Sequence, residues 1–597
     1  KMVNNIVTMV RSQAAKYAEK EVFRYLNKKN NLMASISWTD FIRQVDQVAA
    51  SLYHFGYDSG ENVGIFSNNK PEWLITDLGI MANRGVVVPF YATASASQVK
   101  YIIDETGMRL LFVGGNDQLA VARSLLIETE TLEMIIVFDP DYESDNPKIL
   151  PFREFIKIGC SEKFKERKAE LESEWQSDDL ATIIYTSGTT GEQKGVMLGH
   201  DNFLFSFGIH NKRLHVTEND LSMCFLPLSH VFERTWSLYL LHKGATNFIL
   251  ENPREVIEYL PKVKPTLMCT VPRFFDKTYE GIVAEKAKWP GWKQKVFDWS
   301  IRVGRHASNY QRTSSPLPSW LKFRYSIANA VVLKKLRQVF GGNIKEMPCA
   351  GAAIRPELLR FFHATGIFIN YGYGATETTA TVSCFRTEEY DFDTCGTIMP
   401  DIYVKISDEG EILVKGGTVF KGYYKKPEAS AEVLKDGWYY TGDEGKIKQK
   451  DALVMTDRIK DLMKTSVGKY VSPQKLELLL GQDDLIEQVI TVGDNQKFVT
   501  ALIVPAIDSL KKLAKIQGIE FKDVKDLLRK NEIIEIFRTR INLHQQDLTP
   551  YERVVDFRLL HEPFSIENQA MTSTLKLRRR VITNKYRHLI DEMYSNA

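Results

Sequence analysis

The chain has 597 residues, of which 44% are hydrophobic and 26% are charged. This composition is typical of a globular protein and excludes disordered, collagen-like and fibrous classes. At roughly 150 residues per domain, the length predicts about four domains or subdomains and makes a large enzyme the first expectation. The 78 basic and 75 acidic residues nearly balance, which excludes a protein that coats nucleic acid with a wholly basic surface.

The six cysteines are scattered and include no CxxC pair, so we expect neither a disulfide framework nor a zinc site with cysteine ligands. Arg11, Lys16 and Lys20 interrupt the first apolar stretch, and nowhere do 18 uncharged apolar residues follow one another. The sequence therefore predicts no signal peptide and no transmembrane span. We expect reduced thiols and a cytoplasmic protein that can also meet the inner face of the membrane peripherally.

The first clear element is a βαβ unit between residues 61 and 91. Two β-branched runs, VGIFS and VVVPFY, enclose an amphipathic stretch in which Leu74, Leu78 and Met81 share one helical face. Asn69 is expected to cap this helix, with Pro71 in its first turn. Because such strands are buried on both faces, the pattern predicts a parallel sheet and, as it continues, a large α/β body.

Residues 183–200, IIYTSGTTGEQKGVMLGH, form the sharpest local feature. A β-branched strand opens into a loop of serine, threonine and glycine that ends at Lys194. Glycines let successive N–H groups face one anion, hydroxyls add donors and the lysine adds charge, so the loop predicts polyphosphate binding. The spacing is not that of a P-loop, and a flexible surface turn is the alternative.

This loop resembles the signature of the acyl-adenylate-forming (AMP-binding) superfamily, YTSGTTGxPKGV, with Gln193 in place of the usual proline. The other motifs of that family follow in order along most of the chain. The resemblance implies a large N-terminal body, residues 1–456, with two α/β sheets and a small β subdomain, and a small mobile α/β domain, residues 457–597. It also implies that Thr186 is a magnesium ligand. The residues implied to bind the phosphates of ATP are Thr186, Ser187, Gly188, Thr189, Thr190, Gly191 and Lys194.

PLSHVFERTW, residues 227–236, is most similar to long-chain fatty acyl-CoA synthetases. The resemblance places His230 beside the acyl carboxylate, whereas a lone histidine is more often structural. Some family members have a tryptophan gate four residues after this histidine. Arg234 stands there instead and Trp236 follows it, so no gate is assigned.

The stretch 286–337 carries twelve lysines and arginines against one acid, Asp298, with aromatic residues interleaved. This pattern suits a peripheral membrane contact, and a solvated face with buried aromatics is the alternative. No RNA- or DNA-binding motif accompanies the charge, so nucleic acid is not expected as a partner.

YGYGATETT, residues 371–379, combines an aromatic residue that can stack on a purine, a hydroxyl for phosphate and a carboxylate suited to Mg²⁺. A capped turn with a solvated Glu377 is the alternative. By resemblance Glu377 holds Mg²⁺ and Thr376 contacts phosphate, while Tyr373 stacks on adenine. The remaining nucleotide-site residues implied by the resemblance are Tyr371, Gly372, Gly374, Gly351, Ala352 and Ala353.

Beyond Asp401, short alternating strands with glycine-rich turns predict a small β subdomain, followed by a compact α/β tail. Asp443, after the Gly442 turn, suits a ribose diol, although an Asx-turn explains it as well. Arg458 can brace the same sugar. By resemblance Asp443 and Arg458 clamp the ribose and Lys460 is the hinge between the domains.

Two further positions come from the C-terminal part. In GKYVSP the resemblance assigns Gly468 and Lys469 to a coenzyme A channel, where a glycine lets pantetheine pass close to the backbone. TSTLKLRRR aligns Lys576 with the family's adenylation lysine, a cation that can bridge the attacking carboxylate and the α-phosphate. A solvated, basic helix start is the alternative for Lys576.

The predicted function is ligation of a long-chain fatty acid to coenzyme A through an acyl-AMP intermediate, with ATP, Mg²⁺ and coenzyme A required. Within the same class, the alternatives are a fatty acyl-AMP ligase that serves a carrier protein and an aryl or medium-chain acyl-CoA ligase. A peptide-synthetase adenylation domain is a further alternative. Phe232-Glu233 argues against it, because such domains have Phe-Asp where the amine of an amino acid is bound. A non-catalytic nucleotide- or lipid-binding protein is the alternative outside the enzyme class.

Overall fold

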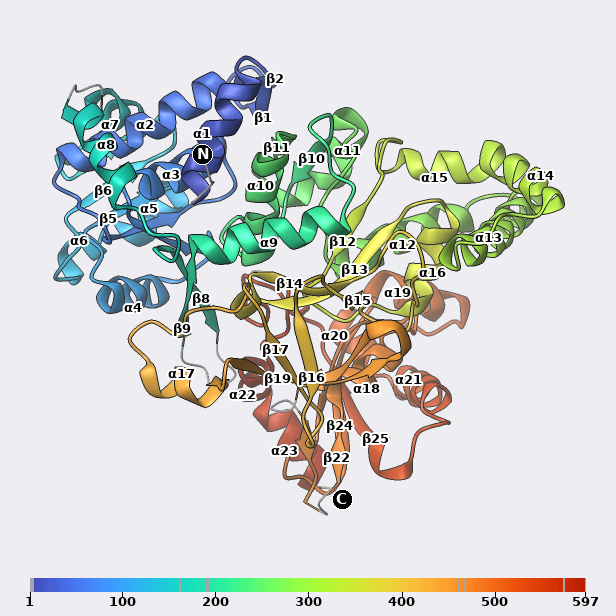
Figure 1. Cartoon of the computed structure of the whole chain (residues 1–597). Coiled ribbons are helices and arrows are strands. Elements are labelled where there is room, and N and C mark those ends of the chain that lie inside the picture. The colour runs from blue at the N-terminus through green and yellow to red at the C-terminus, as the bar shows by residue number, and fades with distance from the viewer. Residues whose placement is uncertain are drawn as a thin grey trace. The chain divides into compact units, whose positions relative to one another are not determined.

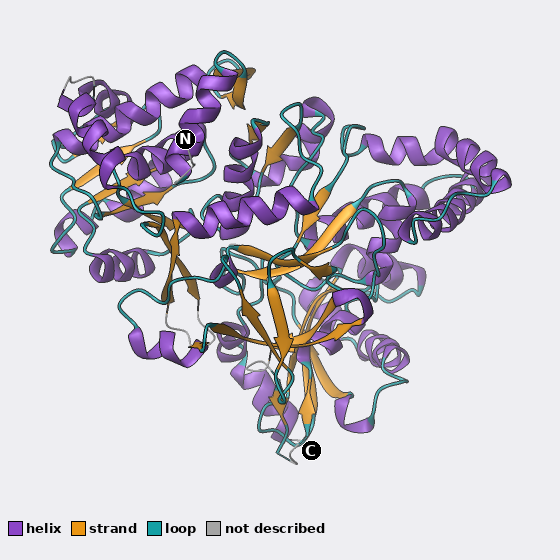
Figure 2. Cartoon of the chain, viewed as in Figure 1, coloured by secondary structure: helices purple, strands orange, loops and turns teal. Residues whose placement is uncertain are grey.

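The computed structural model describes residues 5–159, 163–187, 193–458, 462–466, 469–572 and 575–595 (Figure 1). The chain divides into two compact units. Unit 1 consists of Lys1–Lys405, Leu413–Thr441 and Ile447–Val454, and unit 2 of Ile406–Ile412, Gly442–Lys446 and Met455–Ala597. Helices and strands occur together in both units, as Figure 2 shows, which confirms the predicted α/β class.

A seven-stranded sheet in unit 1 carries the first functional motif. Its strand order is β7-β6-β5-β3-β4-β8-β9, with all neighbours parallel except β8 and β9. The bounds are β3 (Asn62–Phe66), β4 (Val86–Phe90), β5 (Leu110–Val113), β6 (Met134–Val137), β7 (Ile149–Pro151), β8 (Leu180–Ser187) and β9 (Gln193–Gly199). Val86 and Val88 belong to one hydrophobic cluster and Val87 to another. Strand β4 is therefore buried on both faces, as the sequence predicts.

Helix α3 (Pro71–Ala82) joins β3 to β4, but its start differs from the prediction. The N-cap is Lys70, which makes no side-chain cap bond, and Pro71 occupies the first turn. The Asn69 side chain instead binds a distant loop: its Nδ2 donates to the Leu226 carbonyl at 2.8 Å and its Oδ1 accepts from the Leu228 N–H at 3.0 Å. The tertiary hydrogen bonds take the side chain that local capping would have used.

Two further groups of strands complete unit 1. One sheet has the order β10-β11-β1-β2, from β1 (Glu21–Asn27), β2 (Leu32–Ser37), β10 (Leu221–Cys224) and β11 (Thr246–Ile249). In the other group β12 (Met347–Cys349), β13 (Ile369–Ala375), β14 (Ala380–Cys384) and β15 (Thr397–Ile398) pair in sequence order, and β15 also pairs with β20 (Ala452–Arg458). Short strands follow Asp401 as predicted, namely β16 (Tyr403–Ile406), β17 (Glu411–Lys415) and β19 (Trp438–Lys448), and each of them is divided between units 1 and 2.

Several helices of unit 1 position the site residues. They are α4 (Ala96–Thr106), α9 (His200–Arg213), α10 (Val231–Lys243), α12 (Pro272–Ala287), α13 (Gly291–Arg312), α14 (Ser319–Ala328), α15 (Lys334–Gln338) and α16 (Pro356–Ala364). Within the described part of the chain, no helix combines the length and apolar character needed to cross a bilayer.

Unit 2 is built on a three-stranded sheet, β23 (Ile486–Val492), β24 (Val499–Pro505) and β25 (Val554–Leu559). The central strand β24 is buried throughout, and its alternate residues enter two different hydrophobic clusters. The surrounding helices include α18 (Pro473–Leu480), α19 (Ile507–Ile516), α21 (Asn531–His544), α22 (Arg579–Lys585) and α23 (Arg587–Ser595). Helix α18 begins at Pro473, and its N-cap Ser472 accepts a hydrogen bond from the Lys475 N–H.

Candidate active site

The β8–β9 hairpin brings the two ends of the predicted phosphate loop together. Thr186 pairs with Lys194 across the antiparallel ladder, and Ser187 pairs with Gln193. Directly opposed residues place their side chains on the same face of a sheet, so the Thr186 hydroxyl and the Lys194 ammonium share one face. The intervening loop residues Gly188, Thr189, Thr190 and Gly191 lie outside the described residues.

Helix α4 holds the loop end of this hairpin. The Tyr101 hydroxyl donates to the backbone carbonyl of Gln193 at 3.3 Å, and the Tyr185 hydroxyl donates to the Glu105 carboxylate. Burial and the neighbouring Glu105 carboxylate raise the pKa of Tyr185, so its hydroxyl keeps the proton that it donates. Gln193, the departure from the family pattern, is thus anchored through its backbone.

A third segment lies along β9 and adds a residue that the sequence analysis did not assign. The Met197 N–H donates to the Gly422 carbonyl at 3.0 Å, and the Tyr424 N–H donates to the Gly195 carbonyl at 2.8 Å. These bonds place Tyr423 next to Lys194, whose Nζ lies 5.3 Å from the centre of the tyrosine ring.

Tyr423 also reaches the predicted magnesium ligand. Its hydroxyl donates to Glu377 Oε1 at 2.9 Å, and Glu377 lies in the short 3₁₀ helix η3 (Thr376–Thr378) directly after β13. Burial and the negative charge of Glu377 raise the pKa of Tyr423. Lys194, Tyr423 and Glu377, here called the hairpin site, therefore bring a cation to the ring and a carboxylate to the hydroxyl of one tyrosine side chain.

The chemistry of this donor set suits a magnesium–polyphosphate ligand. Mg²⁺ is usually held by one or two carboxylates together with phosphate oxygens, and Glu377 supplies a carboxylate while Thr186 supplies a hydroxyl. Lys194 adds a positive charge for the phosphates. Among the described residues no cluster of three or more histidine, cysteine, aspartate or glutamate side chains forms a metal site.

The glycines of the YGYG motif are required by strand packing. A Cβ on Gly374 would lie 1.5 Å from the Ala380 carbonyl oxygen, and one on Gly372 would lie 2.5 Å from the Ser383 carbonyl oxygen. Both contacts are with β14, so these glycines let β13 and β14 approach closely. Tyr373 and Thr376 are each 7% exposed, and their adenine and phosphate roles stay predictions.

The small residues 351–353 adjoin the same strand. The Tyr371 hydroxyl donates to the Ala352 carbonyl at 3.1 Å, which ties this segment to β13. Gly351 has a φ of +96°, a conformation that favours glycine. Residues 351–353 are exposed at the surface of unit 1.

His230 is the N-cap of α10. Its Nδ1 accepts a hydrogen bond from the Phe232 N–H at 3.2 Å, so the structural role considered for this histidine is present. The loop before it is held by Asn69, as described above. Its predicted place beside an acyl carboxylate stays a prediction.

The side chains in the first turns of α10 belong to the buried core of unit 1. Arg234 is fully buried, donates through Nε to Asp77 Oδ2 at 3.0 Å and through Nη1 to Thr182 Oγ1 at 2.6 Å, and lies 5.5 Å from the Trp73 ring. Trp236 is 5% exposed and donates to Ser222. Neither side chain is placed to act as a gate.

Glu233, which directly precedes Arg234 in α10, is also fully buried, with Cys224 and Ser237 as polar neighbours. Burial raises its pKa to about 8, so the carboxyl is largely protonated at neutral pH. Glu233, Arg234 and Trp236 are here called the α10 core.

Unit 2 holds the remaining predicted residues. Asp443 is 7% exposed and follows Gly442, whose φ is +73° and whose N–H donates to Glu411 Oε1 at 2.8 Å. Arg458 ends β20, and its side chain lies outside the described residues, as do Lys460 and Gly468. Lys469 lies with its Nζ 5.6 Å from the centre of the Tyr551 ring.

Lys576 lies three residues before α22. Its N–H donates to Thr572 Oγ1 at 3.1 Å, and the Thr572 N–H donates to the Lys576 carbonyl at 2.8 Å. Helix α22 begins only at Arg579, so Lys576 lies outside the helix.

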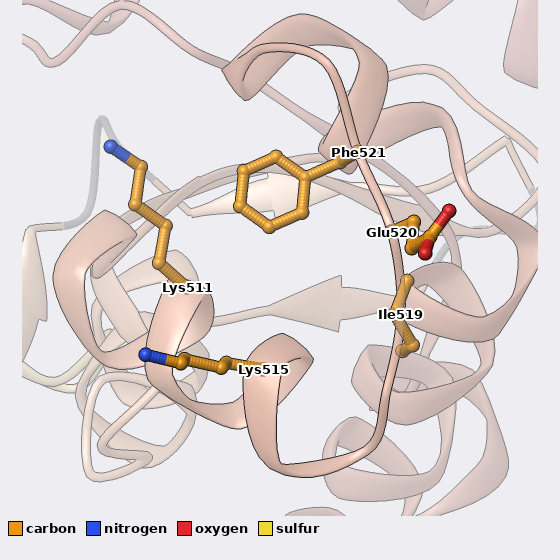
Figure 3. Close-up of a pocket in the computed structure, with 5 residues that line it drawn as sticks. All are labelled: Lys511, Lys515, Ile519, Glu520 and Phe521. Atoms are coloured by element: carbon orange, nitrogen blue, oxygen red, sulfur yellow. The ribbon is translucent and has the colours of Figure 1, made fainter.

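An open hollow in unit 2, shown in Figure 3, includes none of the predicted site residues. It lies between α19 and the segment after it and is lined by Lys511, Lys515, Ile519, Glu520 and Phe521.

Comparison with known proteins identifies the family. The AMP-binding enzyme profile matches residues 10–424, and the profile of the AMP-binding enzyme C-terminal domain matches residues 460–597. The chain belongs to the AMP-binding enzyme family.

Its relatives match over almost the whole length. It is 30% identical over 579 residues to Long-chain-fatty-acid–CoA ligase FadD15 of Mycobacterium bovis, covering 94% of this chain and 93% of that protein. It is also 30% identical to human Long-chain-fatty-acid–CoA ligase 1, covering 92% of this chain and 80% of that protein.

Solved structures share the fold. The A-PCP didomain of carboxylic acid reductase from Segniliparus rugosus aligns with a TM-score of 0.75 at 20% identity, covering 99% of this chain and 82% of that one. The anthranilate CoA ligase AuaEII aligns with a TM-score of 0.73 at 18% identity, covering 98% of both chains.

Proposed function

We propose that the protein ligates a long-chain fatty acid to coenzyme A in an ATP-dependent, AMP-forming reaction. The observation that carries this proposal is the hairpin site, where Lys194 and Glu377 meet across Tyr423. A cation and a carboxylate held by the same tyrosine suit a magnesium-bound polyphosphate and have no evident use in a protein that binds lipid alone. The relatives named for long-chain fatty acids supply the substrate class.

The first half-reaction would join the acid to AMP. A carboxylate oxygen of the fatty acid attacks the α-phosphorus, the bond from that phosphorus to the bridging oxygen breaks, and pyrophosphate leaves. Thr186 and Lys194 would bind phosphate oxygens, and Lys576 would lower the repulsion between the approaching anions. Glu377 and Thr186 would hold Mg²⁺, which neutralises phosphate charge when bound.

The second half-reaction would transfer the acyl group. The sulfur of coenzyme A attacks the acyl carbonyl carbon, the bond to the AMP oxygen breaks, and a thioester and AMP result. Asp443 and Arg458 would retain the ribose, while Gly468 and Lys469 would border the path of the thiol. No side-chain nucleophile is required, so catalysis would rest on positioning and charge neutralisation.

Release of AMP and pyrophosphate across acids from acetate to oleate, each with and without coenzyme A, tests this proposal. We expect AMP only when both a long-chain acid and coenzyme A are present. Adenylate that accumulates without thioester would favour a carrier-protein acceptor, and absence of pyrophosphate with every acid would overturn the proposal.

Lys576→Ala separates the roles within the site. We expect this variant to lose formation of the adenylate while still converting added acyl-AMP and coenzyme A to thioester. Unchanged adenylation would remove the role proposed for Lys576.

A further inference from the structure

Helices α13, α14 and α15 form a helical arm of unit 1. The π-helical turn η2 (Asn329–Leu333) connects α14 to α15, so residues 319–338 are one continuous helical run. Figure 1 shows this run and α13 together, in yellow-green, at the opposite end of unit 1 from β5 and β6. Residues 291–338 are here called the arm.

The inner side of the arm is packed against the body of unit 1. Leu321, Ala328 and Leu333 are buried. A Cβ on Gly304 of α13 would lie 2.1 Å from the Ala364 carbonyl oxygen at the end of α16, so α13 and α16 are in close contact. Arg337 donates to the Thr365 carbonyl at 2.7 Å. The arm is therefore fixed to the body along its inner face.

The outer side of the arm is apolar where a solvated helix would be polar. Trp320, Phe323, Ile327 and Val331 are 55%, 70%, 42% and 44% exposed. Their spacing of three, four and four residues puts them on one helical face. The run thus has two apolar faces, of which only the inner one is covered, mainly by α13, which in turn packs against α16 of the body.

Exposed tryptophan is confined to the arm. Of the nine tryptophans in the chain, all of which are described, only Trp292 and Trp320 are exposed by more than a third. Tryptophan is enriched at membrane interfaces, where its ring is apolar and its N–H is solvated.

Positive charge surrounds this apolar face. The one acid of the arm, Asp298, is bound by Lys286 at 2.6 Å. Arg324 stacks over Trp299 at 5.8 Å, beside the apolar face. Six further cations are exposed and form no ion pair with any residue that the structure describes: Lys295, Arg302, Arg305, Lys322, Lys334 and Lys335.

We infer that the arm is a docking surface for an anionic lipid bilayer. Trp292, Trp320 and Phe323 would enter the interfacial layer, and the unpaired lysines and arginines would meet anionic headgroups. A second copy of the chain fits less well, because like charges would then face one another. Nucleic acid would satisfy the charge but leave the apolar face exposed to water. The inference rests on this surface and does not depend on the proposed activity.

Sedimentation with lipid vesicles tests it, without nucleotide, fatty acid or coenzyme A. We expect the full-length protein to bind vesicles of phosphatidylcholine mixed with phosphatidylglycerol and to bind phosphatidylcholine alone much more weakly. Each lysine near an anionic surface contributes roughly a fivefold change in partitioning, so Lys334→Gln with Lys335→Gln should weaken binding roughly 25-fold. Vesicles with brominated acyl chains should quench fluorescence less in Trp320→Phe than in the unchanged protein.

Matched controls separate the arm from charge and exposure in general. Lys28→Gln with Lys29→Gln removes the same charge from adjacent, exposed lysines at the β1–β2 turn, and Ile127→Ser removes a side chain that is 90% exposed. Both should bind like the unchanged protein, whereas Trp320→Ser with Phe323→Ser should lose binding. Equal binding by the arm and control variants would overturn the inference. So would a lipid-free dimer that the Phe323→Ser change dissociates, or RNA binding that depends on Lys334 and Lys335 but not on Trp320.

Discussion

The hairpin site and the α10 core both carry charged residues inside family motifs, yet the protein uses them differently. In the α10 core Arg234 is fully buried and its guanidinium is bound by Asp77 and Thr182. In the hairpin site Lys194 is only half-buried, and its ammonium lies over the Tyr423 ring. A charge whose donors are already used by the protein stabilises the fold, whereas a charge beside an aromatic face can still serve a ligand.

The largest effect is expected in the α10 core. Arg234→Met should lower the free energy of unfolding by about 3–5 kcal/mol, because it leaves the Asp77 carboxylate buried without its partner. Denaturant titration measures this loss. The double variant Arg234→Met with Asp77→Leu should regain much of it, and a double variant as unstable as the single one would contradict the ion-pair explanation.

Lys194→Met should lower activity and leave stability nearly unchanged, in contrast to Arg234→Met. We expect kcat/KM to fall roughly 10²–10³-fold, as when one preorganised donor is removed from a transition state. The free energy of unfolding should change by less than about 1 kcal/mol, because a cation–π contact that is partly open to solvent stabilises a fold by no more than about that amount. Lys421→Met, in the same segment as Tyr423 but paired with Asp201, is the control and should retain activity. A large loss of stability in Lys194→Met would erase the contrast.

Glu233 gives the α10 core a pH dependence. Its folded-state pKa of about 8 lies above the usual 4.5, so between these values the native chain holds a proton that the unfolded chain has released. Stability should therefore fall as pH rises, by about 2–3 kcal/mol between pH 5 and 7.

The difference between Glu233→Gln and the unchanged protein isolates this contribution. Other buried groups act with the opposite sign: burial lowers the pKa of His200 and His210 to about 4, so these histidines favour folding as pH rises toward 6.5. Unfolding curves at several pH values should differ in slope between Glu233→Gln and the unchanged protein, and equal slopes would contradict the proton assigned to Glu233.

The smallest expected effect is at Tyr423. Tyr423→Phe keeps the ring beside Lys194 but removes the hydrogen bond to Glu377. We expect kcat/KM to fall about tenfold and the magnesium concentration for half-maximal activity to rise, because the carboxylate loses one charge-assisted donor. A magnesium titration measures both. A magnesium dependence that does not move would separate Tyr423 from the metal ligand.

Local pattern predicted the βαβ unit, because hydrophobic runs are encoded by neighbouring residues. The pairing of Thr186 with Lys194 across a hairpin came from the structure. Contacts between distant residues were out of reach. Asp77 and Arg234 are 157 positions apart, and Tyr423 reaches β9 through backbone pairing that no motif announces. The Asn69 cap was wrong for the same reason, since a loop 157 and 159 residues away binds its side chain.

The cysteines have a practical consequence for studying the molecule. Five of the six, namely Cys224, Cys269, Cys349, Cys384 and Cys395, are buried and none of these five is in a disulfide. Burial raises the pKa of Cys224, Cys269, Cys349 and Cys384, so little thiolate is present to react while the chain is folded. Alkylating reagents would therefore label these positions only when unit 1 opens, and mass spectrometry of the labelled peptides could time that opening without any added probe.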